Sequence, residues 1–101
     1  MILEVALLQV KAGQEQQFEI DFDKASQYIS SIDGYKGHTL RRCLEAKGKY
    51  ILLVDWIDVD AHEINFRQSP QYLEWKAMLH HYYDPFPTVE HYETVFENSN
   101  Q

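Results

Sequence analysis

The chain has 101 residues, a formal net charge of −7 and nine Lys and Arg residues, which fits one domain around a single core. The acidic balance excludes a surface that tracks nucleic-acid phosphates, and the absence of a long apolar run or a signal-peptide pattern argues against a membrane partner. Its single Cys cannot form an internal disulfide. A single cysteine without a disulfide partner is typical of a reducing compartment, so we expect a cytoplasmic protein.

The first third of the sequence predicts a strand followed by a helix. Residues 2–10 carry apolar side chains on both faces of an extended segment, and Gly13 lies in the turn that ends it. Residues 14–32 follow as a helix, because apolar side chains recur at three- and four-residue steps: Phe18, Phe22, Ala25, Ile29 and Ile32. Gly34 can then adopt the left-handed conformation that closes a helix.

Three further strands are expected. Residues 35–44 and 49–57 form a hairpin around the turn at 46–48, and residues 88–96 form the last strand. The segment 49–57 is dense in Tyr, Ile, Leu, Val and Trp, with polar residues mainly at its edges. This composition favours a strand that is buried on both faces.

An acidic, capped helical segment follows the hairpin. Asp58 or Asp60 supplies the N-cap, and Glu63 completes a capping box with Asp60. One helical face is expected to combine Ala61, Ile64 and Asn65.

Ser69 and Pro70 then predict a break and a restart. Pro disfavours helix in the residue before it and is well placed in the first turn of a new helix capped by Ser69. The restarted helix carries apolar side chains at helical spacing: Tyr72, Trp75, Met78 and Leu79.

The element order is the ferredoxin-like βαββαβ arrangement of the α+β class, with a four-stranded antiparallel sheet. Nothing divides residues 1–97, which we expect to form one domain, with residues 98–101 as a tail. Two helices cover only one face of such a sheet, yet the first and third strands are apolar on both. A second copy of the chain is the economical cover, so we expect a homodimer that pairs through its sheets.

From the third strand onward, small, aromatic and Ser-Pro positions follow in a fixed order: Trp56, Ala61-His62, Phe66, Ser69-Pro70, Tyr72, Trp75, Pro85-x-Pro87 and the run from Val89 to Glu93. This order resembles the antibiotic biosynthesis monooxygenase family across almost the whole chain. The resemblance implies a ferredoxin-like domain that pairs into a dimeric α+β barrel. It also implies one of the family's activities, which include cofactor-independent oxygenation of polyphenols, haem degradation and quinol oxidation.

Three positions distinguish the haem-degrading branch of this family. Its members resemble one another in an Asn on the first strand, a Trp in the second helical segment and a haem-ligating His. At the matching places this chain has Ala6, Phe66 and Lys76. A haem iron would lack its proximal ligand unless His80 or His81 replaced it, so the resemblance favours the branches without haem.

The candidate chemistry lies in five His residues and many aromatic ones, because imidazole moves protons at neutral pH and aromatic walls suit flat ligands. His91 is the first candidate base, since strand alternation places it beside Val89 on a buried face. His62 is the second. The alternative for both is a structural imidazole in the core or dimer interface. The remaining imidazoles are expected to cap a helix C-terminus (His80 and His81) or to lie at a sheet edge or interface (His38).

The spacing of these residues argues against other site classes. No His-x-x-x-His or Glu-x-x-His step places two metal ligands on one helical face. There is also no glycine-rich phosphate loop, no Gly-x-Ser-x-Gly elbow and no dinucleotide fingerprint. We therefore expect no metal, flavin or haem cofactor.

We predict a cofactor-independent monooxygenase that oxidises a small quinol-like or polyphenol-like substrate with molecular oxygen. His91 or His62 would remove the phenolic proton, and Tyr72 or Arg67 would orient the ring. The substrate pocket would be walled by aromatic side chains: Trp56, Phe66, Tyr72, Trp75 and Phe86. Two alternatives stay open, a non-catalytic dimeric module that binds a small ligand and a related isomerase that moves a proton without oxygen.

Overall fold

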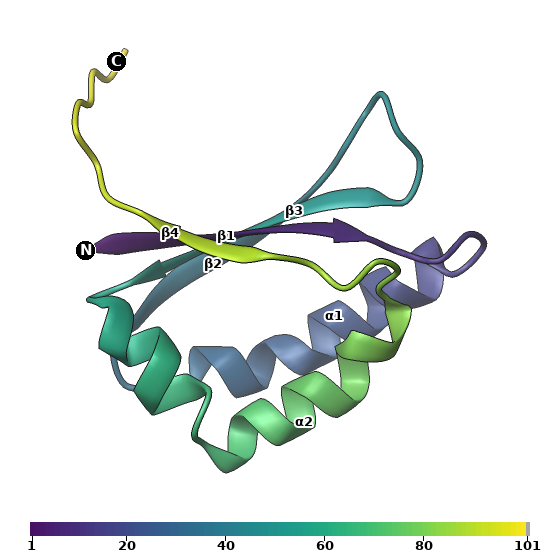
Figure 1. Cartoon of the computed structure of the whole chain (residues 1–101), viewed down its shortest axis with the longest axis horizontal. Coiled ribbons are helices and arrows are strands. Elements are labelled where there is room, and N and C mark those ends of the chain that lie inside the picture. The colour runs from purple at the N-terminus through teal and green to yellow at the C-terminus, as the bar shows by residue number, and fades with distance from the viewer. Residues whose placement is uncertain (101) are drawn as a thin grey trace.

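The computed structural model describes residues 1–100, in which two layers, one of sheet and one of helices, pack face to face (Figure 1). The elements in chain order are β1 (Ile2–Gln9), α1 (Glu15–Ser30), β2 (Tyr35–Arg42), β3 (Lys49–Trp56), the π-helical segment η1 (Ala61–Phe66), α2 (Pro70–Leu79), the 3₁₀ turn η2 (His80–Tyr82) and β4 (Val89–Tyr92). The antiparallel sheet has the order β2-β3-β1-β4. The predicted ferredoxin-like arrangement is confirmed.

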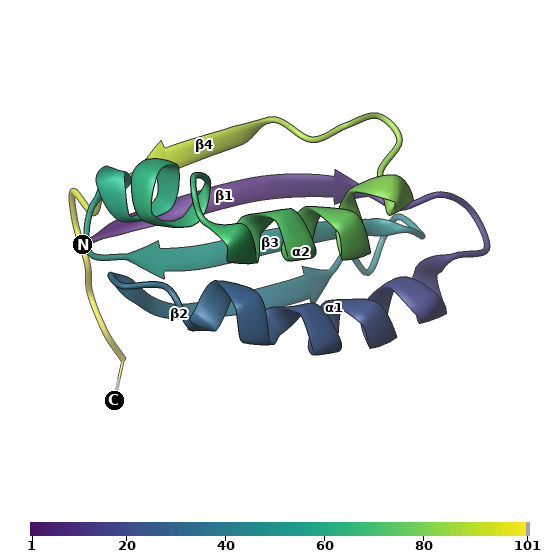
Figure 2. The same cartoon turned by 90° about the horizontal axis from the view of Figure 1, so that it is seen from below.

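Both long helices lie on the same face of the sheet (Figure 2). The side chains of β3 alternate accordingly: Leu52 and Val54 point toward the helices and are buried, whereas Ile51 and Leu53 point to the other face and are only half-buried. The same alternation on β1 and β4 leaves an open sheet face with apolar side chains at its centre and charged ones, such as Arg41, Asp55 and Glu90, around them. The apolar side chains are Leu3, Val5, Leu7, Ile51, Leu53 and Tyr92. No helix in the described part of the chain is long and apolar enough to cross a membrane.

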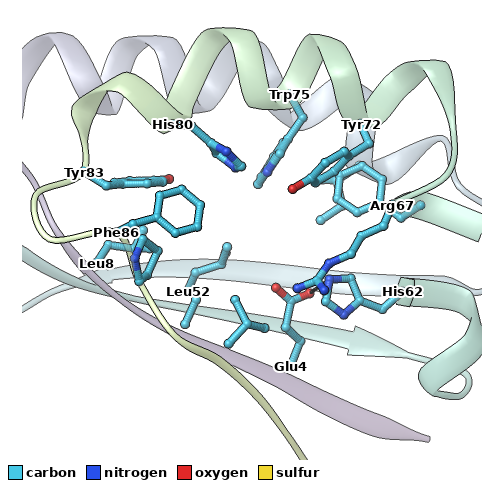
Figure 3. Close-up of a pocket in the computed structure, with 15 residues that line it drawn as sticks. Glu4, Leu8, Leu52, His62, Arg67, Tyr72, Trp75, His80, Tyr83 and Phe86 are labelled. Carbon is cyan, nitrogen blue, oxygen red and sulfur yellow. Dashed lines mark ion pairs between the residues drawn. The ribbon is translucent and has the colours of Figure 1, made fainter. Parts of the chain in front are cut away.

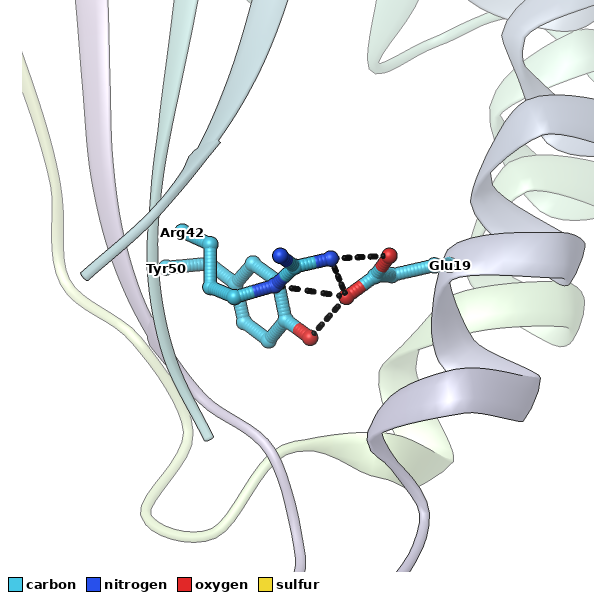
Figure 4. Close-up of polar contacts among 3 residues, drawn as sticks. All are labelled: Glu19, Arg42 and Tyr50. Carbon is cyan, nitrogen blue, oxygen red and sulfur yellow. Dashed lines mark hydrogen bonds and ion pairs between the residues drawn. The ribbon is translucent and has the colours of Figure 1, made fainter. Parts of the chain in front are cut away.

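Helix α1 is anchored to the sheet by its predicted apolar stripe and by one polar cluster. Phe18, Phe22, Ala25 and Ile29 are all buried. On the same helix, Glu19 accepts two hydrogen bonds from the Arg42 Nη2 atom, at 2.7 and 2.8 Å, and one from the Tyr50 hydroxyl at 2.6 Å (Figure 4). Burial and the bond to Glu19 raise the pKa of Tyr50 to about 12. The cluster fixes the start of α1 against the end of the β2–β3 hairpin.

The last strand is shorter than predicted. We expected residues 88–96, but β4 covers only Val89–Tyr92. Its register pairs Tyr92 with Leu3, so β1 has little chain left to pair with the residues that follow. Val95 and Phe96 are 93% and 82% exposed where the chain leaves the sheet (Figure 1). Residues 98–100 of the predicted tail have no helix or strand, and Gln101 lies outside the described residues.

Two expectations for the segment after β3 were wrong. The cap is Asp58, whose Oδ1 accepts from the Ala61 amide at 2.8 Å, and Asp60 makes no side-chain cap, so no capping box forms. The expected face of Ala61, Ile64 and Asn65 is not formed either. In η1 the Arg67 amide donates to the His62 carbonyl five residues earlier, and this wider turn buries Ala61, His62 and Phe66 while leaving Ile64 exposed.

The predicted restart at Ser69 is confirmed. Its hydroxyl accepts from the Tyr72 amide at 3.1 Å, and Pro70 is the first residue of α2. The restart turns α2 so that Trp75 and Leu79 are buried against the sheet layer. Trp75 and Tyr72 thereby reach the space between the helices and the sheet.

Candidate functional site

A pocket opens between the helical layer and the sheet (Figure 3). Side chains of β1 and β3 form its floor, α2 and η2 form its roof, and η1 closes one end. The space between these walls is about 510 Å³ when the open mouth is included. The lining residues are Glu4, Ala6, Leu8, Ile29, Leu52, His62, Phe66, Arg67, Tyr72, Trp75, His80, Tyr83, Phe86, Pro87 and Val89.

Most of the side chains predicted for the substrate pocket meet there. Phe66, Tyr72, Trp75 and Phe86 line it, and so do Arg67 and His62. Rings from η1 and α2 pack edge to face, with centroid distances of 5.2 Å between Phe66 and Tyr72 and 5.8 Å between Phe66 and Trp75. These aromatic rings are therefore both core residues and pocket walls.

Two predicted site residues do not line the pocket. Trp56 is fully buried, and its indole N–H donates to Glu4 Oε1 at 2.9 Å. His91 lies on the inward face of β4, as strand alternation predicted, but it is separated from the pocket by His62. Both residues support the pocket from behind.

Glu4 is a pocket residue that the sequence analysis missed. It is 5% exposed and lies on the inward face of β1 with Ala6 and Leu8. Burial raises its pKa, while the hydrogen bond from Trp56 and the positive charge of Arg67 act in the opposite direction. A carboxylate at an inward position of an otherwise apolar strand was the available signal, because a buried acid requires a specific partner.

His62 is held by partners at both ring nitrogens. Its Nδ1 lies 2.8 Å from His91 Nε2, and its Nε2 lies 3.4 Å from Glu4 Oε1. The ring stacks on Trp56, with centroids 5.4 Å apart and planes at 21°. Burial lowers the pKa of His62 to about 3, and Arg67 and His91 act in the same direction. Near neutral pH the ring is therefore uncharged, and its contact with Glu4 is not an ion pair.

The histidines that end α2 have different roles. The His81 ring donates to the Met78 carbonyl at 3.1 Å, in line with the predicted capping role. The His80 ring instead faces the pocket, 5.0 Å from the Phe86 ring and 5.9 Å from the Tyr72 ring by their centroids. Burial, Lys76 and Arg67 lower its pKa to about 4. The pocket thus holds a second neutral imidazole, which sequence spacing assigned to the helix end.

The remaining candidates lie elsewhere. His38 is on the edge strand β2, as predicted, but its ring points toward α1, where Ser26 Oγ lies 3.0 Å from its Nε2. Of the three positions tested for the haem-degrading branch, Ala6 and Phe66 line the pocket and Lys76 is exposed on α2. Within residues 1–100, no group of three or more His, Cys, Asp or Glu side chains is placed to hold a metal ion.

The pocket has an apolar part and a polar end. Tyr83, Phe86, Trp75 and the aliphatic floor make up the apolar part, whereas Glu4, His62 and Arg67 gather at the other end (Figure 3). Such a site can hold a flat aromatic molecule and present one of its polar substituents to a buried carboxylate.

The fold and this pocket define the class of the protein. The chain belongs to the antibiotic biosynthesis monooxygenase family, because the family model described as "Antibiotic biosynthesis monooxygenase" matches residues 1–78. Among the proteins to which it is similar, the uncharacterized protein YczJ of Bacillus subtilis is 48% identical over 95 residues, covering 94% of this chain and 100% of YczJ.

Two solved structures have the same fold. A Bordetella bronchiseptica protein assigned to the antibiotic biosynthesis monooxygenases is 35% identical, with a TM-score of 0.89 over 94% of this chain and 97% of its own. SnoaB, a cofactor-independent oxygenase from Streptomyces nogalater, is 23% identical, with a TM-score of 0.75 over 99% of this chain and 97% of its own. At that identity, the likeness to SnoaB is one of fold.

Proposed function

We propose that the protein is a cofactor-independent monooxygenase that oxidises a small quinol-like or polyphenol-like substrate with molecular oxygen. The observation that carries this proposal is one pocket that combines aromatic walls with a buried carboxylate and a neutral imidazole at one end. The family membership and the shared fold with an oxygenase that uses no cofactor support it.

In the proposed reaction the substrate itself is the reductant. The substrate is a ring system whose CH₂ group is conjugated with a carbonyl, and in its phenolic tautomer one CH₂ hydrogen has moved to that oxygen. This phenol loses its hydroxyl proton, and the anion, whose charge lies partly on the remaining ring CH carbon, passes one electron to oxygen. The two radicals combine into a peroxide, which takes up a proton and eliminates water. In balance, CH₂ and O₂ give C=O and H₂O, with all four electrons supplied by the substrate carbon. The protein has to remove the first proton and keep bulk water from the intermediates.

Different pocket residues would bind the substrate, orient it and remove its proton. Trp75, Phe66 and Phe86 would hold the ring system, and the Tyr72 hydroxyl and the Arg67 guanidinium, which point into the pocket in Figure 3, would orient its oxygen substituents. Of the two predicted bases only His62 lines the pocket, and His91 contacts it from behind, so proton removal would involve the acid–base residues at the polar end of the pocket. Arg67 would also favour the phenolate because it is a positive charge beside the developing anion.

Oxygen consumption tests this function. Purified, metal-depleted protein is assayed against a panel of quinols, catechols and polycyclic phenols, with heat-denatured protein as the control for spontaneous autoxidation. We expect uptake above autoxidation for at least one polycyclic phenol. Phe86→Ala, at the exposed rim of the pocket, should lower kcat/KM roughly tenfold through lost apolar contact, whereas Leu73→Ala, exposed on α2 outside the pocket, should not.

Either of two results would contradict the monooxygenase proposal and favour one of the alternative functions. Product formation without oxygen would indicate the isomerase, in which the same acid–base residues move a proton within the substrate. Tight binding of a phenol with neither oxygen uptake nor product would indicate the non-catalytic binding module.

We also propose that the protein is a homodimer in the cytoplasm. A second copy would cover the open sheet face, whose Leu3, Val5, Ile51 and Leu53 side chains are only half-buried in one chain. Cys43, the chain's one cysteine, is a free thiol, which favours a reducing compartment.

A further inference from the structure

Three titratable side chains from distant parts of the chain form one connected acid–base group: Glu4, His62 and His91. Glu4 on β1 and His91 on β4 are direct partners in the antiparallel register, so both point to the helical side of the sheet next to each other. His62 of η1 lies against both, with its Nε2 3.4 Å from Glu4 Oε1 and its Nδ1 2.8 Å from His91 Nε2.

The members of this group that line the pocket are less exposed to solvent than His91. Glu4 and His62 are 5% and 2% exposed, and both line the pocket. His91 is only half-buried, on the edge strand of the sheet, and does not line the pocket. The group therefore runs from the pocket to the protein surface, and His62 is its middle member.

The partners of each polar atom determine which of the three side chains can contact a substrate. An imidazole has two ring nitrogens, and both nitrogens of His62 already face a partner. Glu4 Oε1 faces Trp56 and His62, which leaves the second carboxylate oxygen of this pocket-lining residue for a ligand. The carboxylate, and not either predicted histidine, is the group in position to accept a proton from the pocket.

We propose that Glu4 is the catalytic base that takes the hydroxyl proton of a phenolic substrate, and that His62 and His91 carry this proton between the buried pocket and solvent. This inference rests on the proposed oxygenase function for its substrate class, an aromatic molecule with an ionisable hydroxyl group. It assigns a role to Glu4 and makes His91 a proton carrier instead of a base in contact with the substrate.

Each proton transfer in this path balances. The O–H bond of the phenol breaks and the proton binds the free oxygen of Glu4. Rotation of the carboxyl group then presents this proton to His62 Nε2, which accepts it as the O–H bond of Glu4 breaks. At the same time the proton on His62 Nδ1 moves to His91 Nε2, and the proton on His91 Nδ1 leaves to water. The substrate becomes a phenolate, Glu4 is again a carboxylate, and both rings are neutral with the opposite nitrogen protonated.

The second half of the proposed reaction resets the group. The peroxide needs one proton before water is eliminated, and the same path run inward supplies it from solvent through His91. That return restores the original nitrogen on each ring. The electrostatics suit both directions, because burial makes Glu4 a stronger base than an exposed carboxylate and keeps His62 neutral.

Proton removal can be followed with a chromogenic phenol. We would mix the protein with 4-nitrophenol, at a pH where the free probe is mostly protonated, and record phenolate absorbance by stopped flow. Glu4→Gln keeps an acceptor for Trp56 but removes the base, so phenolate should no longer form. Phenolate accumulates only once its proton has left Glu4, so His91→Ala should slow this accumulation about 100-fold, and added imidazole should restore the rate. His81→Ala, which removes an exposed ring away from the pocket, is the matched control.

The outcomes separate a proton path from a structural role. Slow phenolate formation in His91→Ala with recovery in imidazole supports the proposal. An unchanged rate in His91→Ala, or a slow rate that imidazole does not restore, overturns it. Phenolate formation in Glu4→Gln at the wild-type rate also overturns it.

A measurement without ligand keeps this test independent of the oxygenase. Ring-nitrogen NMR of ¹⁵N-histidine protein reports which nitrogen of each ring is protonated. Because the three groups are connected, Glu4→Gln should change the ring signals of His91 as well as those of His62, whereas Glu90→Gln, on the exposed face of β4, should leave the protonated nitrogen unchanged. Unaltered His91 signals in Glu4→Gln overturn the connection, even if oxygen is consumed. If oxygen uptake fails while the connection holds, only the oxygenase proposal falls.

Discussion

Single side chains set the charge state of the pocket, and the two imidazoles that line it are neutral because they are buried. His62 and His80 have pKa values of about 3 and about 4 in the fold, compared with 6.5 for an exposed ring. Arg67 contributes to both shifts, and Glu4 and His91 are the other titratable groups beside His62. The folded protein thus resists taking up protons that the unfolded chain binds readily.

This difference predicts how stability depends on pH. Between about pH 6.5 and 4 the unfolded chain binds more protons at these rings than the folded protein, so the free energy of unfolding should fall as the pH falls. One proton accounts for at most about 1.4 kcal/mol per pH unit. Glu4 acts in the opposite direction just above pH 4.5, because its raised pKa keeps a proton on the folded state.

Urea unfolding at several pH values checks this prediction. His62→Gln should reduce the loss of stability per pH unit by up to the contribution of one proton, whereas Leu73→Ala, at an exposed position without a titratable group, should leave the slope as it is. If the free energy of unfolding of the wild-type protein stays constant or increases as the pH is lowered from 6.5 to 5, the buried rings are not held neutral.

At the scale of the elements, the junction between α1 and β2 leaves no room for a side chain at Gly34. Its φ is +94°, and an added Cβ would lie 2.6 Å from the Ala61 Cβ at the start of η1. Gly13 has a similar φ of +84° but open space around it. The two glycines therefore share a backbone conformation and differ in packing.

Gly34→Ala should destabilise the protein more than Gly13→Ala. We expect about 1 kcal/mol for Gly13→Ala from the backbone alone, and roughly 2–3 kcal/mol more for Gly34→Ala because η1 must move. Denaturant unfolding of both variants measures the difference. Since η1 carries His62 and Phe66, Gly34→Ala should also weaken binding of a phenol probe; equal unfolding free energies for the two variants would contradict this account.

Much of this architecture follows from local patterns. The stripe on α1, the strand β3 and the Ser69 cap were predictable because periodicity and capping depend on near neighbours in the sequence. The end of β4 was not, because it depends on its register with β1, which the segment 88–96 does not encode. The face of η1 was wrong because the pattern was interpreted with an α-helical period, and the segment has the wider π turn.

The candidate site was predictable to a similar extent. Aromatic residues at helical spacing indicated the walls, and strand alternation indicated the inward orientation of His91. That His62 lies in front of His91 depends on the packing of η1 against β4, which no spacing reports. Glu4 could have been found, since its position in β1 matches that of the buried Ala6 and Leu8.

For the molecule as a whole, the proposed dimer depends on the open sheet face. Leu53 is at its centre on β3, next to Val5 on β1 in the register. Leu53→Lys would place two like charges in the interface of a symmetric dimer without partners, and we expect it to shift the protein from dimer to monomer. Leu73→Lys, at a 64% exposed position on α2, should not.

Light scattering coupled to size-exclusion chromatography measures this change. A monomeric wild-type protein, or a Leu53→Lys variant that is folded and still dimeric, would exclude pairing through the sheets. Circular dichroism of the variant distinguishes loss of pairing from loss of fold.

The stacking of Trp56 on His62 gives the protein a fluorescent label of its own. The chain has two tryptophans, and the fold places them in different surroundings. Trp56 is bonded to Glu4 and lies against the His62 ring, while Trp75 is part of the pocket wall. Emission from Trp75 therefore reports occupancy of the pocket, and emission from Trp56 reports protonation beside it. With Trp75 replaced by Phe, Trp56 is the one tryptophan left, and its emission would follow changes in the acid–base group of an unlabelled protein in real time.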